Sequence, residues 1–263
     1  MRILITNDDG INAPGLNVMK RIALTLAGSE NRVWTVAPAT EQSGMGHCVS
    51  FTRPFQISQI SHQTFAVEGT PTDCVLAALY DVMPAMIPDL VLSGVNCGNN
   101  SGENALYSGT VGAALEASLH GITGIALSQY YGPDNRDLKN PFSAAEEFAV
   151  DAVNAILRSS PETDDDYRLF YNVNFPPCAA EDVVGMCTAF QGKRSSGTFR
   201  ALRADSPTRR TFLWVRAAPQ DVAGREGADV TMNLQRYVSI TPMRADLTAY
   251  ADIDNLNKQL ACP

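Results

Sequence analysis

The sequence lacks the side-chain groupings that bind zinc or build a disulfide framework. Its six cysteines are scattered, none forms a Cys-x-x-Cys pair, and only three histidines are present. Structural zinc sites need closely spaced cysteine or histidine ligands, and disulfide frameworks are typical of small secreted domains. We therefore expect reduced thiols, no zinc site and a cytoplasmic protein.

Positive charge and long apolar runs are also scarce. The chain carries 20 Lys and Arg against 28 Asp and Glu, which gives a net charge of −8, and it has no basic block. This balance argues against a nucleic-acid polymer as a partner. No apolar run approaches the ~20 residues of a membrane span, and no basic-plus-apolar leader precedes the first strand. We expect no association with a membrane.

The apolar pattern at the start of the chain predicts a strand, a helix and a second strand. Residues 2–5 form a short apolar run, residues 14–27 carry apolar side chains at helical spacing, and residues 33–37 form a second run. This order is typical of a βαβ unit in a parallel sheet. Further strands are predicted at 89–93, 124–128 and 168–174, helices at 70–83, 111–117 and 141–157, and a hairpin within 48–67.

The composition of the sequence changes near residue 178, and apolar residues no longer recur at helical spacing beyond it. Strands are predicted at 211–215 and 237–241 in a smaller β-rich part. A chain of 263 residues with 45% hydrophobic residues allows one large or two small domains. We expect an α/β core over residues 1–177 and a β-rich extension with a C-terminal arm over 178–263, which grips another subunit.

Two adjacent carboxylates follow the first predicted strand. Asp8 and Asp9 stand just past its carboxyl end, the edge at which open α/β sheets bind their ligands. Adjacent carboxylates repel each other, so a divalent cation with a preference for oxygen is expected between them. The alternative is an ordinary turn, because Asp and Gly favour tight turns for backbone reasons alone.

The loops after the next two parallel strands offer further oxygen donors. Ser43 follows the second strand and Asn96 follows the third. With the two aspartates they would form an oxygen site for Mg²⁺ or Mn²⁺. Because two aspartates only just neutralise a dication, a phosphate dianion could still bind. The alternatives are an ordinary loop serine and a turn-forming asparagine.

A phosphate also needs hydrogen-bond donors, and one helix start offers them. Ser108, Gly109 and Thr110 would supply hydroxyls, backbone N–H groups and the positive end of a helix dipole. Gly98 and Gly102 would let the backbone approach a ligand closely. The alternative for Ser108 and Thr110 is plain capping of the helix.

These motifs together resemble those of the SurE family, the survival-protein nucleotidases of bacteria and archaea. In chain order they are Asn7-Asp8-Asp9-Gly10, Gln42-Ser43-Gly44, Gly69-Thr70-Pro71-Thr72-Asp73-Cys74, Ser93-Gly94-Val95-Asn96, Tyr107-Ser108-Gly109-Thr110-Val111 and Val238-Ser239-Ile240-Thr241-Pro242. The resemblance spans residues 2–248. Cys48 departs from it, since a serine is frequent there, and so does the run Gln235-Arg236-Tyr237, where a glycine is usual.

The resemblance implies a metal-dependent phosphatase for nucleoside 5′- and 3′-monophosphates, in some members also for short polyphosphate. It implies a Rossmann-like core and a homodimer or homotetramer with exchanged C-terminal segments. One divalent cation per subunit, Mg²⁺ or Mn²⁺ (Ca²⁺ in a crystal), would be held by Asp8, Asp9, Ser43 and Asn96. The implied phosphate-binding residues are Asn96, Gly44, Asn100, Ser108, Gly109 and Thr110. Asp8 and Asp9 would be catalytic, as acceptors of a proton from water or as a phosphorylated nucleophile.

The sequence argues against two other classes of protein. A phosphorylation-switched receiver domain needs an aspartate at the end of a later strand, but the strand at 89–92 is followed by Ser93, and the chain is about twice too long. A dinucleotide-binding module is disfavoured because no Gly-x-Gly-x-x-Gly follows the first strand. A non-catalytic nucleotide or phosphate sensor stays open.

Overall fold

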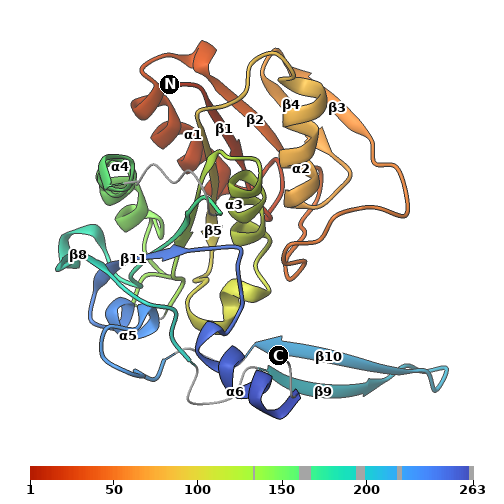
Figure 1. Ribbon diagram of the computed structural model, residues 1–263. Helices are drawn as coiled ribbons and strands as arrows, with labels where there is room; N and C mark the ends of the chain where they lie inside the picture. Colours follow the sequence, from red (N-terminus) through yellow and green to blue (C-terminus); the bar gives the residue numbers. More distant parts are fainter. Residues whose placement is uncertain (133, 160–166, 194–198, 218–220, 261–263) are drawn as a thin grey trace.

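A nine-stranded sheet forms the centre of the molecule (Figure 1). The computed structural model describes residues 1–132, 134–159, 167–193, 199–217 and 221–260. The strands of the large sheet are β1 (Ile3–Thr6), β2 (Val33–Pro38), β3 (Ile57–Ser61), β4 (Thr64–Val67), β5 (Leu90–Cys97), β6 (Thr123–Gln129), β7 (Phe170–Phe175), β8 (Gly185–Thr188) and β11 (Tyr237–Met243). Their order is β3-β4-β2-β1-β5-β6-β7-β11-β8.

The sheet is mostly parallel, as the sequence predicts. Strands β4, β2, β1, β5, β6 and β7 pair in parallel, while β3 and β11 run antiparallel to their neighbours β4 and β7. Every residue of β1, β2, β6 and β7 is buried. Burial on both faces is typical of parallel strands and explains why β1 is almost entirely apolar.

Helices cover both faces of the sheet. They are α1 (Pro14–Ala27), α2 (Pro71–Ala77), α3 (Gly109–Leu119), α4 (Ser143–Ser159), α5 (Asp229–Leu234) and α6 (Tyr250–Leu260). Side chains alternate along β1: Ile3 and Ile5 join a core with α1 and α4, while Leu4 joins a second core with α2 and α3. This period of two places the two helix pairs on opposite faces. Within the described residues, no helix has the length and apolar character to cross a membrane.

Local sequence signals define where two of the helices begin. Helix α1 begins at Pro14 and ends before Gly28, whose backbone is left-handed (φ 71°), so its bounds match the prediction. Helix α2 begins with a capping box in which the Thr70 hydroxyl accepts from the Asp73 N–H while the Asp73 carboxylate accepts from the Thr70 N–H.

Two details of the predicted sheet are wrong. The third parallel strand does not end at residue 93, because β5 continues pairing with β6 as far as Cys97, with a register shift between Gly94 and Asn96. Tyr237–Met243 does not belong to a separate β-rich part, because β11 pairs with β7 and β8 in the large sheet. The large sheet therefore uses strands from both sides of residue 177.

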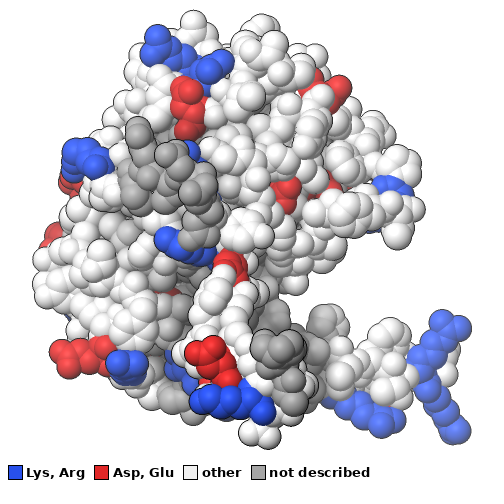
Figure 2. All heavy atoms as spheres, viewed as in Figure 1, with Lys and Arg blue, Asp and Glu red and all other residues white. Residues whose placement is uncertain are grey.

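A second, two-stranded antiparallel sheet projects from the body of the molecule (Figure 1). It consists of β9 (Phe199–Asp205) and β10 (Thr211–Ala217), so the strand predicted at 211–215 is confirmed. Figure 2 shows Lys and Arg side chains gathered at the far end of this hairpin, whose turn contains Arg209 and Arg210. Helix α6 buries none of its residues in the single chain.

Candidate metal and phosphate site

A cavity of about 280 Å³ lies at the carboxyl ends of β1 and β5. Seven of the predicted site residues line it, namely Asp8, Asp9, Ser43, Gly44, Asn96, Asn100 and Ser108. The other two, Gly109 and Thr110, contact Asp8 from the start of α3. The structure therefore brings all nine together, from segments that are far apart in the sequence.

Asp8 is the buried carboxylate of the site. It is 4% exposed, and its Oδ1 accepts a hydrogen bond from the Thr110 hydroxyl at 2.5 Å. The pKa of Asp8 is raised to about 6, because burial raises it more than the Thr110 hydrogen bond lowers it, and the negative charge of Asp9 adds to the rise. The ionised form is thus destabilised by desolvation, and a nearby cation would reverse this effect.

Asp9 lies nearer to solvent and has a second carboxylate beside it. Its Oδ2 accepts from the Cys97 N–H at 3.2 Å. Burial raises the pKa of Asp9, and the negative charge of Glu41 adds to the shift. No lysine, arginine or histidine is among the described residues that line the cavity. The site therefore concentrates negative charge with no basic side chain to balance it.

The two neutral oxygen donors are oriented by local hydrogen bonds. The Ser43 hydroxyl donates to Glu41 Oε1 at 2.8 Å, which leaves its lone pairs for a cation. The Asn96 Nδ2 donates to the Gly98 carbonyl at 2.8 Å, so the amide oxygen is the atom that could bind a cation. In the described part of the chain no three His, Cys, Asp or Glu side chains group to hold a metal. A cation would thus need these neutral donors beside Asp8 and Asp9, and the all-oxygen set fits Mg²⁺ or Mn²⁺.

The Asp-Asp-Gly segment is also a genuine turn. Asn7 Nδ2 donates to the Gly10 carbonyl and the Gly10 N–H donates to Asn7 Oδ1, at 2.9 and 3.2 Å. Gly10 has φ 101°, a conformation that L side chains rarely adopt. The turn and the acidic site are compatible, because the turn fixes the direction in which the two carboxylates leave the strand.

The start of α3 lies directly against Asp8. Ser108 caps the helix, since its hydroxyl accepts from the Val111 N–H at 3.1 Å. A Cβ atom on Gly109 would lie 2.9 Å from Pro71 Cγ and 3.0 Å from Asp8 Cβ. Only glycine lets the helix end approach this closely, and the positive end of its dipole then faces the carboxylates. Ser108 is thus a cap and a lining residue at once.

Asn100 uses its polar atoms inside the protein. Its Nδ2 donates to Ser128 Oγ at 2.8 Å, its N–H donates to Asn174 Oδ1 at 2.7 Å, and its carbonyl accepts from Asn172 Nδ2 at 2.9 Å. These bonds hold the loop after β5 onto β6 and β7. Asn100 therefore lies at the cavity as a residue that shapes the loop, and its contact with phosphate stays a prediction.

Five further residues that were not predicted as site residues also line the cavity, namely Glu41, Cys97, Asn104, Tyr107 and Phe199. Glu41 stands two positions before Ser43 and could have been found as a third carboxylate at a strand end. Phe199 comes from β9, and its ring meets that of Tyr107 edge-on with centroids 5.1 Å apart. No local signal could have placed a residue of the projecting sheet beside the strand ends.

The fold and the site define an α/β protein with an acidic, all-oxygen site at the carboxyl edge of a parallel sheet. Residues 3–198 match the family described as Survival protein SurE. The chain is 56% identical to "5′-nucleotidase SurE" of Roseobacter denitrificans over 95% of its own length and 96% of the relative, and 56% identical to "5′-nucleotidase SurE" of Jannaschia sp. over 97% and 98%. The crystal structure of the SurE protein from Aquifex aeolicus matches with a TM-score of 0.81 and 34% identity, covering 99% of this chain and 100% of that one. The chain belongs to the SurE family.

Proposed function

We propose that this chain is a divalent-metal-dependent phosphomonoesterase that hydrolyses nucleoside 5′-monophosphates to nucleoside and phosphate. Nucleoside 3′-monophosphates and short polyphosphate are proposed as further substrates. The observation that carries the proposal is the convergence of Asp8, Asp9, Ser43 and Asn96 on one cavity beside the start of α3. The names of the two close relatives support the substrate class.

The residues proposed to hold the cation are Asp8, Asp9, Ser43 and Asn96. When bound, Mg²⁺ or Mn²⁺ supplies charge neutralisation and polarises a phosphoryl oxygen. Thr110 fixes the orientation of Asp8 through its 2.5 Å hydrogen bond. Asp8 or Asp9 would accept a proton from an attacking water: Asp8 is the more buried of the two carboxylates, and Asp9 is the more accessible to solvent. Phosphorylation of one aspartate is the alternative to attack by water.

The start of α3 is the proposed phosphate cradle. The backbone N–H groups of Gly109 and Thr110 lie in the first turn of the helix, where donors have no partner within the helix. The glycine at 109 lets them approach a group held beside Asp8. These donors would bind phosphoryl oxygens and stabilise the charge that spreads over them in the transition state.

The C-terminal part is proposed to assemble the protein. We propose that residues 1–177 form the catalytic core and that residues 178–263, whose strands β8 and β11 complete the large sheet, form the extension that builds a dimer or tetramer. The projecting hairpin exposes large apolar side chains, among them Leu202, Phe212, Leu213, Trp214 and Val215. Helix α6 exposes Tyr250, Ile253, Leu256 and Leu260. Exposed apolar surface of this extent marks an interaction site, and a second copy with exchanged C-terminal segments would cover it.

The alternative function is a nucleotide or phosphate sensor without catalysis. Incubation of the protein with AMP and a metal ion, followed for free phosphate and in parallel for bound AMP, separates the two. Release of many phosphates per subunit supports the hydrolase. Stoichiometric binding of AMP with no release of phosphate would replace the hydrolase with the sensor.

A further inference from the structure

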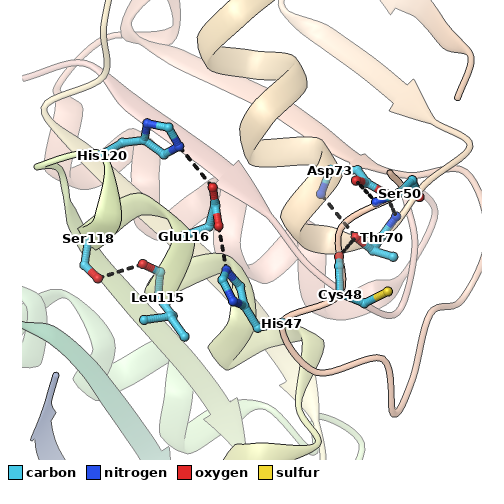
Figure 3. A network of polar contacts seen from close by, with 9 residues as sticks. All are labelled: His47, Cys48, Ser50, Thr70, Asp73, Leu115, Glu116, Ser118 and His120. Atoms are coloured by element: carbon cyan, nitrogen blue, oxygen red, sulfur yellow. Dashed lines mark hydrogen bonds and ion pairs between the residues drawn. The ribbon is translucent and has the colours of Figure 1, made fainter. Parts of the chain in front are cut away.

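The loop that carries Ser43 and Gly44 continues into a segment, residues 46–50, that is fastened to two helices (Figure 3). The Gly46 N–H donates to the Tyr107 carbonyl at 2.9 Å, just before the start of α3. The Cys48 carbonyl accepts from Thr70 Oγ1 at 2.6 Å, at the start of α2. Ser50 donates from N and Oγ to Asp73 at 2.9 and 2.7 Å. The segment thus bridges the two helices that cover one face of the sheet.

The fourth tie of this segment is an acid–imidazole cluster that the proposed mechanism does not use. His47 Nε2 lies 2.5 Å from Glu116 Oε2, and His120 Nε2 lies 3.0 Å from Glu116 Oε1. Figure 3 shows both imidazoles pointing at the one carboxylate from opposite sides. His47 comes from the loop, whereas His120 lies one turn beyond Glu116, at the end of α3. One carboxylate therefore joins a loop histidine and a helix histidine.

Glu116 is suited to hold a fixed position. It is 7% exposed, and although burial raises its pKa, the hydrogen bonds and electrostatic interactions with His47 and His120 together outweigh burial and lower the pKa. The carboxylate thus stays ionised and accepts from both rings. Around the cluster, the Tyr80 ring meets His120 edge-on at 5.7 Å, and Tyr167 and Arg244 line a cavity with His47.

The helix and the segment are in contact one turn before this cluster. A Cβ atom on Gly112 would lie 2.5 Å from the Gly46 carbonyl oxygen, so the backbone of the segment lies directly on the helix. Glu116 is four residues further along α3, which places the His47 tie directly after the Gly46–Gly112 contact. Ser43 is only three residues before Gly46. Movement of the segment away from α3 would therefore carry Ser43 away from Asp8 and Ser108.

We propose that His47 is a positioning residue, whose bond to Glu116 holds the Ser43–Gly44 loop against helix α3 so that Ser43 faces Asp8 and Asn96. His120 contacts the other oxygen of Glu116 from the end of α3 and, within the described residues, makes no tie to the loop. The inference rests on the proposed function, because it takes Ser43 as a ligand of the cation. Partners that orient a ligand in this way are worth on the order of tenfold in metal affinity.

The test compares His47→Ala, His47→Gln and His120→Ala with the unmodified protein. His47→Ala and His120→Ala each remove one imidazole from the same carboxylate, but only the first releases the loop. Hydrogen exchange of residues 39–50 is measured on metal-free protein, and Mn²⁺ binding is measured by calorimetry. We expect His47→Ala to speed exchange of the loop and weaken Mn²⁺ binding about tenfold. His47→Gln, which keeps an N–H donor, should recover most of both, and His120→Ala should leave loop exchange unchanged.

Two results would overturn the inference: loop exchange and Mn²⁺ affinity unchanged in His47→Ala, or equal changes in His47→Ala and His120→Ala. Should His47→Ala not fold, His47→Leu keeps apolar contacts without a donor and gives the same comparison. Failure of the proposed function looks different. The unmodified protein would then release no phosphate from AMP, while the exchange comparison on metal-free protein still decides whether His47 holds the loop.

Discussion

The hydroxyl of Thr110 donates to the carboxylate of Asp8 at 2.5 Å, and so joins the start of helix α3 to the end of strand β1. Thr110 is fully buried and Asp8 is 4% exposed. The hydrogen bond orients the one carboxylate of the site that solvent can hardly reach. It also fixes the distance between the acidic pair and the proposed phosphate cradle.

Removal of this hydroxyl should impair metal binding more than folding. Thr110→Val keeps the volume of the side chain but leaves Asp8 Oδ1 without its donor. We expect the affinity for Mn²⁺ or the rate of phosphate release to fall about 10- to 100-fold. Thr110→Ser keeps the hydroxyl and should stay close to the unmodified protein. Equal activity of the Val and Ser variants would show that the hydrogen bond has no role in the site.

The buried carboxyl of Asp8 predicts a pH-dependent gain in stability for Asp8→Asn. Its pKa is about 6 in the fold against 3.8 for an ordinary aspartate, so its contribution to stability is fully present below about pH 4 and is lost as the pH rises through 6. A shift of this size corresponds to about 3 kcal/mol. In metal-free protein, Asp8→Asn should therefore raise the melting temperature at about pH 8 and change it little at about pH 4.

Calorimetric unfolding in EDTA at the two pH values checks this expectation. Addition of Mn²⁺ at the higher pH should stabilise the unmodified protein and not Asp8→Asn, because only the ionised carboxylate attracts the cation. A variant that is less stable than the unmodified protein at both pH values would contradict the assignment of desolvation as the main effect on Asp8.

The glycine at the start of α3 should be sensitive to a single methyl group. In Gly109→Ala the new Cβ would meet the Pro71 ring and Asp8 at 2.9 and 3.0 Å, so the helix end must move outward. We expect phosphate release to fall at least about tenfold and the free energy of unfolding to fall by about 1–3 kcal/mol. Gly185→Ala is a matched control, since its Cβ would have no neighbour nearer than 3.8 Å. Similar activities of the two variants would argue against the cradle.

If the exposed apolar hairpin forms the subunit interface, charged side chains introduced on β10 should prevent formation of the dimer or tetramer. Leu213 and Trp214 are each 63% exposed in the single chain. The double variant Leu213→Asp, Trp214→Asp should be monomeric in sedimentation equilibrium under conditions in which the unmodified protein is a dimer or tetramer. The aspartates would have to lose their hydration in an interface. Arg209→Asp, in the turn at the far end of the hairpin, serves as a control for charge alone. An unchanged mass of the double variant would move the interface elsewhere.

Local chemistry allowed the core of the fold to be predicted. Some signals depend only on residues that are close in the sequence. They are the apolar runs at β1 and β2, Pro14 at the start of α1 and the capping box of Thr70. The sequence therefore predicted the βαβ order, and with it the edge at which Asp8 and Asp9 lie. The parallel pairing that brings Ser43 and Asn96 to the same edge follows from that order.

Non-local pairing could not be predicted in the same way. The alternation along β11 is the same whether it pairs in the small sheet or with β7, and only tertiary packing decides between them. Glycine and asparagine after Ser93 favour a loop, yet pairing with β6 extends β5 to Cys97. Phe199 lines the cavity from the small sheet, and no local sequence pattern predicts where that sheet lies relative to the large one.

The most direct test of the central claim is phosphate release from AMP by protein stripped with EDTA, before and after addition of Mn²⁺ or Mg²⁺. We expect no release without metal, release restored by the metal, and a loss of orders of magnitude in Asp8→Ala and Asp9→Asn, because each removes a ligand of the cation. Full activity in the presence of EDTA, or full activity of Asp9→Asn with unchanged metal affinity, would contradict it.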